Sequence, residues 1–134
     1  MPELPEVETI ARTLRPALLG KHILSADLRW NRTLVSPSPA KFRNLIRGQQ
    51  IQDIVRRAKF LDIRLSTSHL IINLRMSGDL LVILGGYQPA MHDRLILKLT
   101  DDMTLVFSDP RKFGRIWLVD DPSNIFQTLG PEPL

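Results

Sequence analysis

Apolar residues near the amino terminus recur every three or four positions and form a single stripe. The stripe consists of Val7, Ile10, Leu14 and Leu18. This period is typical of an amphipathic helix, which we predict over residues 5–19. Acidic residues near its start suit the positive end of the helix dipole, and Gly20 supplies a C-terminal stop.

The period shortens toward two in most of the remaining chain, which predicts strands. Residues 94–100 show the alternation most clearly, with Leu95, Leu97 and Leu99 on one face. Strands are predicted at residues 22–30, within 50–65, and at 69–74, 80–84, 94–100, 103–107 and 115–119. Short helices are predicted at residues 39–46 and 122–129, and a tight hairpin turn at residues 101–102.

About eight strands separated by turn signals indicate an α+β, β-dominated domain. We expect an antiparallel β-sandwich or flattened barrel, with the long N-terminal helix packed on it and one or two short helices. A chain of 134 residues corresponds to one domain and can bury a core without staples. It contains no cysteine, and its three histidines are too scattered for a zinc site, so no metal site is expected.

Charge and hydropathy restrict the partners only loosely. The formal net charge of +4 is compatible with a polyanion such as DNA but does not require one. No apolar run approaches the roughly 20 residues needed to span a bilayer. The acidic, proline-rich start is not typical of a signal peptide. We therefore expect a soluble, cytoplasmic protein with no membrane partner.

The amino terminus carries groups suited to covalent chemistry. If Met1 is removed, the chain begins with the secondary amine of Pro2. An α-amino group has a pKa of roughly 7.7–8.0, so a useful fraction is neutral and nucleophilic near pH 7. Glu3 could exchange protons as general acid and base, and Glu6, one helical turn on, could polarise the same site. Pro and Glu are also good helix starters, so the spacing leaves a purely structural interpretation open.

Three further segments combine positive charge with apolar side chains. Arg57 and Lys59 stand two apart in a predicted strand, where they would share a face and clamp a phosphate. A solvated edge strand guarded by charge is the alternative. Met76 precedes a turn, as a core residue or as an apolar wedge. Arg111 and Phe113 lie in one polar loop, where an exposed phenylalanine beside cations is unusual for a plain turn.

These segments resemble formamidopyrimidine-DNA glycosylases, motif by motif. The matching segments read MPELPEVET at the start of the chain, RRAKFL at residues 56–61, LRMSG at 74–78, DPRKFG at 109–114 and GPEPL at 130–134. The resemblance runs from residue 2 to residue 134. Leu4 favours the purine-repair branch, because the endonuclease VIII branch typically has glycine at this position.

The resemblance implies a role for each candidate residue. Pro2 would be the nucleophile and Glu3 the acid and base, with Glu6 in support, and Lys59 would reach the active site and a phosphate. The residues expected to contact DNA are Arg57, His92 and Arg111. The residues expected to fill the gap left by a flipped base are Met76, Arg111 and Phe113. Filling that gap offsets an unstacking cost of a few kcal/mol.

The activity implied by the resemblance is that of a DNA glycosylase and abasic-site lyase. Such an enzyme removes oxidised purines such as 8-oxoguanine and formamidopyrimidines through a proline iminium, followed by β- and δ-elimination. The expected partner is double-stranded DNA with an oxidised base, bound by a monomer, and the chemistry is expected to need no cofactor. A non-catalytic DNA-damage-binding module and a β-sandwich protein-interaction domain are the alternatives.

The resemblance also predicts the domain organisation. We assign residues 1–130 to the N-terminal catalytic domain and residues 131–134 to the start of an interdomain linker. Family members continue into a helix–two-turns–helix domain and usually a four-cysteine zinc finger, both absent from this chain. Zinc is therefore expected only in that absent part. We expect this chain to be a fragment with weak DNA binding and little turnover, because lost phosphate contacts lower affinity steeply.

Overall fold

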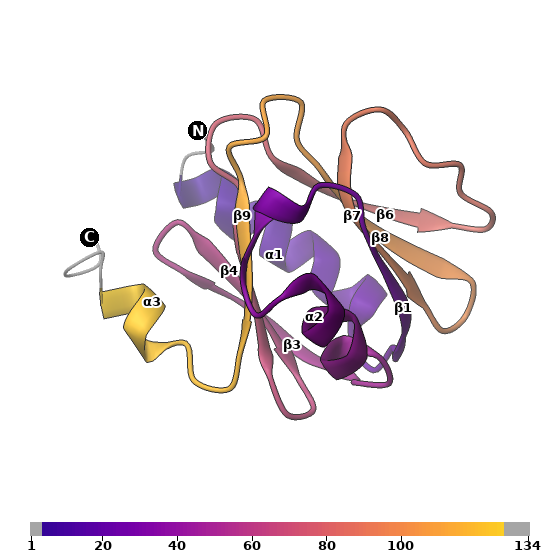
Figure 1. Ribbon diagram of the computed structural model, residues 1–134, viewed down its shortest axis with the longest axis horizontal. Helices are drawn as coiled ribbons and strands as arrows, with labels where there is room; N and C mark the ends of the chain where they lie inside the picture. The colour runs from indigo at the N-terminus through magenta and orange to yellow at the C-terminus, as the bar shows by residue number, and fades with distance from the viewer. Residues whose placement is uncertain (1–3, 128–134) are drawn as a thin grey trace.

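The computed structural model describes residues 4–127, drawn in Figure 1 as helices and strands of a two-layered molecule. The helices are α1 (Leu4–Leu18), α2 (Pro39–Ile46) and α3 (Ser123–Gln127), with a 3-10 turn η1 (Asn31–Thr33). The strands are β1 (Ile23–Leu28), β2 (Leu34–Ser36), β3 (Ile51–Arg57), β4 (Phe60–Leu65), β5 (His69–Asn73), β6 (Asp79–Leu84), β7 (Asp93–Leu99), β8 (Met103–Ser108) and β9 (Arg115–Val119).

The strands of the described residues form two sheets that pack face to face. One sheet has four strands in the order β1-β7-β8-β6, and the other has five in the order β2-β9-β5-β4-β3. The sheets remain separate, so the fold is a sandwich and the barrel alternative is not realised. Their inner faces supply a continuous core that includes Ile63, Ile72, Leu97 and Phe107. The predicted β-dominated α+β class is confirmed.

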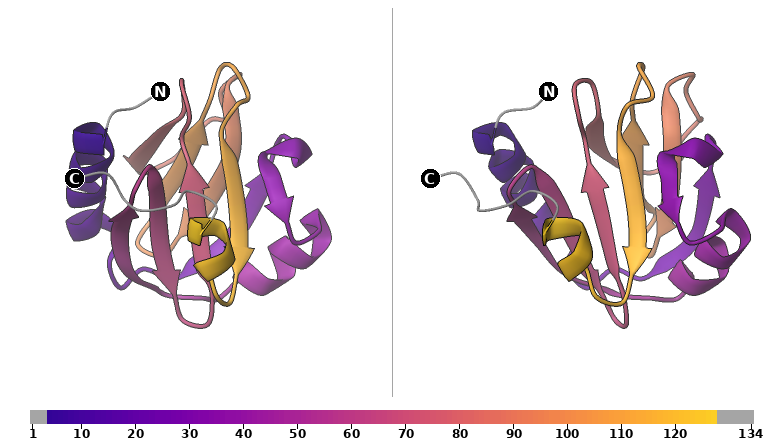
Figure 2. Two further views of the ribbon diagram at one scale, coloured as in Figure 1. Left: turned by 90° about the vertical axis from the view of Figure 1, so that its left-hand side faces the viewer. Right: turned by 60° about the vertical axis from the view of Figure 1, so that its left-hand side comes forward.

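Helices cover both open sides of the sandwich, as Figure 2 shows. Helix α1 contacts β3 and β6, the edge strands on one side, and α2 contacts β1 and β2, the edge strands on the other. The buried face of α1 is formed by Val7, Ala11, Leu14 and Leu18. The predicted stripe is thus confirmed except at Ile10, which is only half-buried, because Ala11 faces the sheet more directly.

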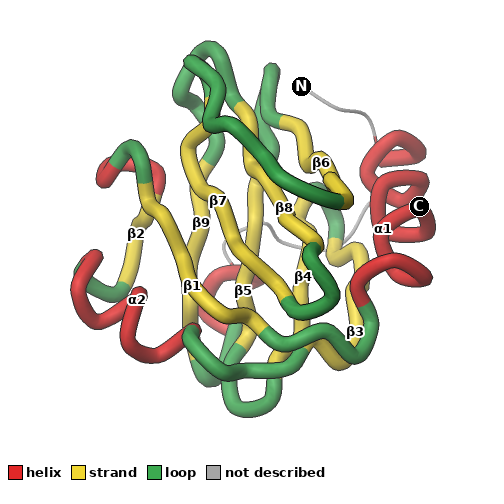
Figure 3. The backbone as a smooth tube through the Cα atoms, turned by 90° about the vertical axis from the view of Figure 1, so that its right-hand side faces the viewer, coloured by secondary structure: helices red, strands yellow, loops and turns green. Residues whose placement is uncertain are grey.

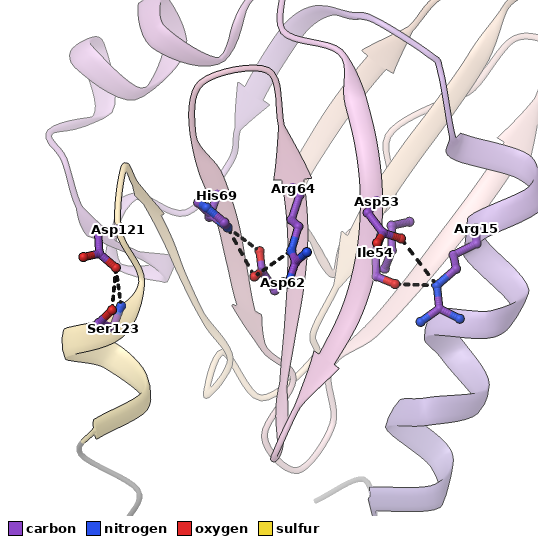
Figure 4. Close-up of polar contacts among 8 residues, drawn as sticks. All are labelled: Arg15, Asp53, Ile54, Asp62, Arg64, His69, Asp121 and Ser123. Atoms are coloured by element: carbon purple, nitrogen blue, oxygen red, sulfur yellow. Dashed lines mark hydrogen bonds and ion pairs between the residues drawn. The ribbon is translucent and has the colours of Figure 1, made fainter.

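Polar contacts fix the direction of α1 along β3. The Arg15 Nε atom donates to the Ile54 carbonyl over 2.6 Å and lies 3.7 Å from an Asp53 carboxylate oxygen (Figure 4). One turn from the start of the helix, Glu8 accepts from Arg56 Nε over 3.0 Å. The first turn of α1 therefore lies beside the carboxyl-terminal end of β3.

The connection between β6 and β7 is longer than a hairpin turn because these two strands run in the same direction, with β8 between them. Residues 85–92 must therefore travel back along the whole sheet, and in Figure 3 this connection crosses the outer face of β8. Two bonds to the Asp93 carboxylate hold its far end, from Tyr87 Oη over 2.6 Å and from the Ala90 amide over 2.7 Å. The Tyr87 hydroxyl donates to this buried carboxylate, which together with burial raises the pKa of Tyr87 to about 12.

Two sequence predictions about strands are wrong. Strand β2 was not predicted; it pairs with β9 in parallel, so the sheets are not wholly antiparallel. The strand predicted to carry both Arg57 and Lys59 ends at Arg57, because residues 50–65 form two strands joined by a turn at Ala58 and Lys59, where Ala58 has a positive φ of 51°. The other predicted strands and short helices are confirmed to within a few residues at their ends, and residues 39–46 match α2 at both ends.

Candidate nucleic-acid interface

Strand pairing brings the described candidate residues to one end of the sandwich. In the five-stranded sheet, Arg57 pairs with Phe60, Phe60 with Asn73, and Asn73 with Arg115. In the four-stranded sheet, Asp79 and Asp93 both pair with Ser108. The β3–β4 turn, the β5–β6 connection, the start of β7 and the β8–β9 connection therefore share this end, and Figure 2 shows the two connections there in both views.

The first turn of α1 lies at the same end, because Glu8 pairs with Arg56 near the end of β3. Glu6 is exposed in this first turn. Pro2 and Glu3, the predicted nucleophile and acid–base residue, lie outside the described residues, as do residues 131–134 of the predicted linker. Their roles stay predictions.

The predicted pairing of Arg57 and Lys59 on one strand face is wrong. Arg57 is the last residue of β3, and Lys59 belongs to the two-residue turn that follows, because Ala58 adopts a left-handed conformation and reverses the chain. Both side chains are exposed. The Arg57 guanidinium carbon lies 4.6 Å from the ring centroid of Phe126, a cation–π distance. Arg57 thus stacks on α3, while Lys59 projects from the tip of the hairpin.

Met76 lies in the turn between β5 and β6 and exposes 52% of its surface. This excludes the core interpretation and is compatible with a wedge. Local hydrogen bonds help to order the turn: Arg75 has a positive φ of 57°, its amide donates to Asn73 Oδ1 over 3.1 Å, and the Gly78 amide donates to the Leu74 carbonyl over 2.9 Å.

The β8–β9 connection holds Arg111 and Phe113 at the surface. Phe113 is 44% exposed, and the Arg111 guanidinium carbon lies 5.1 Å from its ring centroid. Between them, Lys112 has a positive φ of 61°, and its ammonium lies 4.1 Å from the ring centroid of Trp30. The two predicted gap-filling side chains of this loop therefore stack on each other, and the intervening lysine turns the other way.

Asp109, at the start of the same connection, was given no role by sequence reasoning. Its side chain is buried, and its carboxylate accepts from the Gly114 amide over 2.6 Å, the Arg111 amide over 3.3 Å and the Ser77 hydroxyl. The last bond reaches into the turn that carries Met76. An acidic residue inside a basic loop was the only signal for it in the sequence.

His92 is exposed immediately before β7, and its carbonyl accepts from the Asp109 amide over 2.9 Å. Within residues 4–127, this end of the sandwich therefore presents the cations Arg57, Lys59 and Arg111, the imidazole of His92, and two exposed apolar side chains. Cations with interleaved apolar groups are suited to a phosphate backbone and unstacked bases.

The sequence matches the family model for the formamidopyrimidine-DNA glycosylase N-terminal domain over residues 1–116. The chain belongs to the formamidopyrimidine-DNA glycosylase family. Curated relatives include the formamidopyrimidine-DNA glycosylases of Chloroflexus aggregans, at 46% identity over 138 residues, and Legionella pneumophila strain Paris, at 37% over 137 residues. Each alignment covers 100% of this chain and 50% of the relative, so the chain spans about half the length of these family members.

Solved structures of this family share the fold. The Lactococcus lactis enzyme in complex with FAPY-dG-containing DNA superimposes with a TM-score of 0.86 at 31% identity, covering 95% of this chain and 48% of that one. MutM in complex with DNA containing carbocyclic 8-oxo-G superimposes with a TM-score of 0.87 at 32% identity, covering 96% and 48%. The predicted resemblance is thereby confirmed for the family and for the fold of its N-terminal domain.

A second polar cluster lies on the outer face of the five-stranded sheet (Figure 4). Buried Asp62 lies 2.9 Å from His69 Nδ1 and 3.6 Å from Arg64 Nε. Nearby, Asp121 accepts from the hydroxyl and amide of Ser123, which lowers the pKa of its carboxyl. This cluster consists of polar and charged side chains at the sheet surface, and Arg57 and Phe126 line the same surface pocket.

Metal and membrane features can be assessed for the described residues. Between residues 4 and 127, His, Asp and Glu form no group of three that could hold a metal ion. The sequence has no cysteine, so no thiolate of this chain is available to bind zinc. No helix in this part of the chain is long and apolar enough to cross a membrane.

Proposed function

We propose that this chain is the catalytic half of a formamidopyrimidine-DNA glycosylase, which removes oxidised purines from double-stranded DNA and cleaves the abasic site. The observation that carries the proposal is the shared end of the sandwich. The β3–β4 turn, the β5–β6 and β8–β9 connections and the first turn of α1 meet there. Relatives at 31–32% identity with this fold have been solved with damaged DNA, which supports DNA as the partner.

In the proposed reaction, Pro2 acts through its free secondary amine. The neutral nitrogen attacks C1′ of the sugar, an N–C1′ bond forms, and the bond from C1′ to the base breaks as the base takes up a proton. Glu3 transfers protons at the sugar, whose ring opens to leave an iminium. Loss of a C2′ proton then drives β-elimination of the 3′ phosphate, and δ-elimination releases the 5′ phosphate. We propose that no metal or nucleotide cofactor takes part.

The described residues then serve to bind and distort DNA. Lys59, at the exposed tip of its hairpin, neutralises a phosphate near the reacting sugar. Met76, Arg111 and Phe113 enter the space that the flipped base leaves, where Arg111 bonds the widowed base and the apolar groups stack. The Arg111–Phe113 stack keeps this pair together before DNA arrives.

Borohydride trapping on abasic-site DNA at low salt, read by mass spectrometry, tests the proposal. The Met1-free chain should form a covalent adduct at Pro2. Lys59→Ala should lower its yield about tenfold through the lost phosphate contact. Lys98→Ala is the matched control, because Lys98 is an exposed lysine of β7 whose neighbours on the sheet are Ser25 and Thr104, and it should trap like the parent chain. An adduct on a lysine, or DNA binding with no adduct at a free Pro2, would contradict the proposal, and the second outcome would favour a binding module.

A further inference from the structure

The two connections that carry the exposed side chains of the interface are joined through one buried carboxylate. We propose that Asp109 is a positioning residue that makes the Met76 turn and the Arg111–Phe113 loop move as one unit. The inference deepens the proposed function, on which its consequence for DNA rests. The coupling of the two connections concerns the free protein, so it can be tested without DNA.

The Asp109 side chain bonds to both connections. Its side chain accepts from Ser77 on one connection and from Gly114 and Arg111 on the other. Both oxygens are used, and the residue is only 1% exposed. Hydrogen bonds to a buried, charged acceptor are stronger than those between neutral groups, and losing one leaves the remaining partner unsatisfied.

The backbone of Asp109 extends the link to a third segment. Its amide donates to the His92 carbonyl over 2.9 Å, and its carbonyl accepts from Arg94 Nε over 2.8 Å. Arg94 is itself only 7% exposed. The start of β7 therefore anchors Asp109, and through its side chain Asp109 anchors both connections.

Close packing beneath the Asp109 carboxylate leaves little space for the β5–β6 and β8–β9 connections to move. Gly78 and Gly114 both lie against the ring of Phe107, which is only 1% exposed. A Cβ atom on Gly78 would stand 2.9 Å from Phe107 Cε1, and one on Gly114 would stand 3.0 Å from Asp109 Oδ2. Both positions therefore require glycine because the neighbouring atoms approach closely. The two connections pack on the same buried Phe107 ring.

This arrangement has a direct consequence for gap filling. Met76 belongs to one connection, and Arg111 and Phe113 belong to the other, so two independent loops would each lose freedom on entering DNA. A pre-assembled pair loses less, which favours binding. The three side chains then enter the DNA double helix together, and the two loops do not have to insert independently.

Hydrogen exchange of the free 134-residue chain tests the link without DNA. Asp109→Asn should speed exchange of the Gly78 amide, which Asp109 does not touch, at least about tenfold. Ser77→Ala should do the same to the Gly114 amide on the other connection, and Ser77→Thr, which keeps the hydroxyl, should restore protection. Asp102→Asn is the matched control, because it removes the same charge from an exposed turn at the opposite end.

The outcome depends on where the exchange changes. Faster exchange across both connections, with unchanged protection in β4 and β5, supports the link. A change confined to the mutated connection overturns it, for either variant. Should Asp109→Asn fail to fold, the Ser77 pair decides the question, because a lost hydroxyl at a half-buried turn leaves the core intact.

A DNA measurement tests the consequence. The probe is a duplex with 2-aminopurine opposite a tetrahydrofuran abasic analogue, whose fluorescence reports insertion beside the widowed base. Asp109→Asn and Ser77→Ala should both raise the protein concentration that gives the half-maximal fluorescence change about tenfold relative to Asp102→Asn. Ser77→Thr should restore the parent concentration. Responses equal to the control would overturn the positioning role. A parent chain with no response contradicts the proposed DNA function, whereas the exchange comparison still decides the link.

Discussion

Gly114→Ala isolates the close packing beneath the interface loops. The added methyl group would collide with the ring tip of Phe107 and stand 3.0 Å from Asp109 Oδ2 and 3.1 Å from the Asn73 carbonyl. Gly114 does not have a positive φ, so the backbone conformation itself accepts alanine. The penalty is therefore steric, and overpacking of this kind costs about 1–3 kcal/mol.

The measurement is thermal or urea unfolding followed by the fluorescence of the two tryptophans. A loss of about 2 kcal/mol corresponds to a fall in Tm of roughly 6–10 °C for a domain of this size. Gly86→Ala is the matched control, because Gly86 also lacks a positive φ and nothing lies within 4 Å of its Cβ position. That change should be neutral or slightly stabilising, by about 0.5 kcal/mol, through the unfolded chain.

A double-mutant cycle identifies the colliding group. Phe107→Leu shortens the side chain whose tip the new methyl group meets, so Gly114→Ala should cost at least about 1 kcal/mol less in that background. An equal cost in both backgrounds would refute the assignment of the clash to Phe107. A Gly114→Ala protein as stable as the Gly86→Ala control would refute the packing argument altogether.

Two further predictions concern the surface of the sandwich. Tyr87 is the only tyrosine, so absorbance at 295 nm should report its ionisation near pH 12, and Asp93→Asn should bring it back toward the ordinary value of about 10. Because folding raises the pKa of Tyr87, the protonated hydroxyl contributes its full stabilisation of the folded state below pH 10, and this stabilisation is lost as the pH rises toward 12. Equal titration of the parent protein and Asp93→Asn would contradict the prediction. Phe126→Ala removes the ring beneath Arg57 and a half-buried apolar contact, so we expect a loss of about 1–2 kcal/mol, and an unchanged urea midpoint would count against it.

The helices and most strands follow from local patterns, but strand β2 could not be predicted. Leu34–Ser36 is only three residues long and lies beside a proline-rich loop, so no period is visible. Its partner β9 is about 80 residues away in the chain and runs parallel to it. Only the assembled five-stranded sheet gives this segment its conformation.

The β3–β4 turn escaped prediction because it lacks the residues that usually mark one. Turns with positive φ favour Gly, Asn or Asp, and here Ala58 takes that conformation between charged neighbours. In contrast, the Asp101–Asp102 pair correctly predicted the hairpin turn between β7 and β8, and both residues have a positive φ. The error mattered for the interface, because it placed Lys59 on a strand face when it stands at a hairpin tip.

The candidate side chains themselves were predicted from short motifs, but the contacts that hold them were not. Met76, Arg111 and Phe113 are exposed, as a wedge requires. Asp109 and Ser77 are 32 positions apart, and no period or spacing indicates that a carboxylate in one loop accepts a hydroxyl from another. Such a bond exists only after β6 and β8 have paired, because their register places Asp79 opposite Ser108 and so brings Ser77 and Asp109 together.

Strand direction explains why motifs so far apart in the sequence meet at one end. Each strand reversal sends the chain to the opposite end of a sheet, so the turns after β3 and β5 lie together while the turn after β4 lies at the far end. Strand β8 ends at the same end, and the chain crosses from there to the other sheet. Between residues 4 and 127, only residues 85–92 break the alternation, because they return along the outer face of the sheet before β7 begins. Without that return, His92 would lie at the opposite end, so the long connection completes the interface.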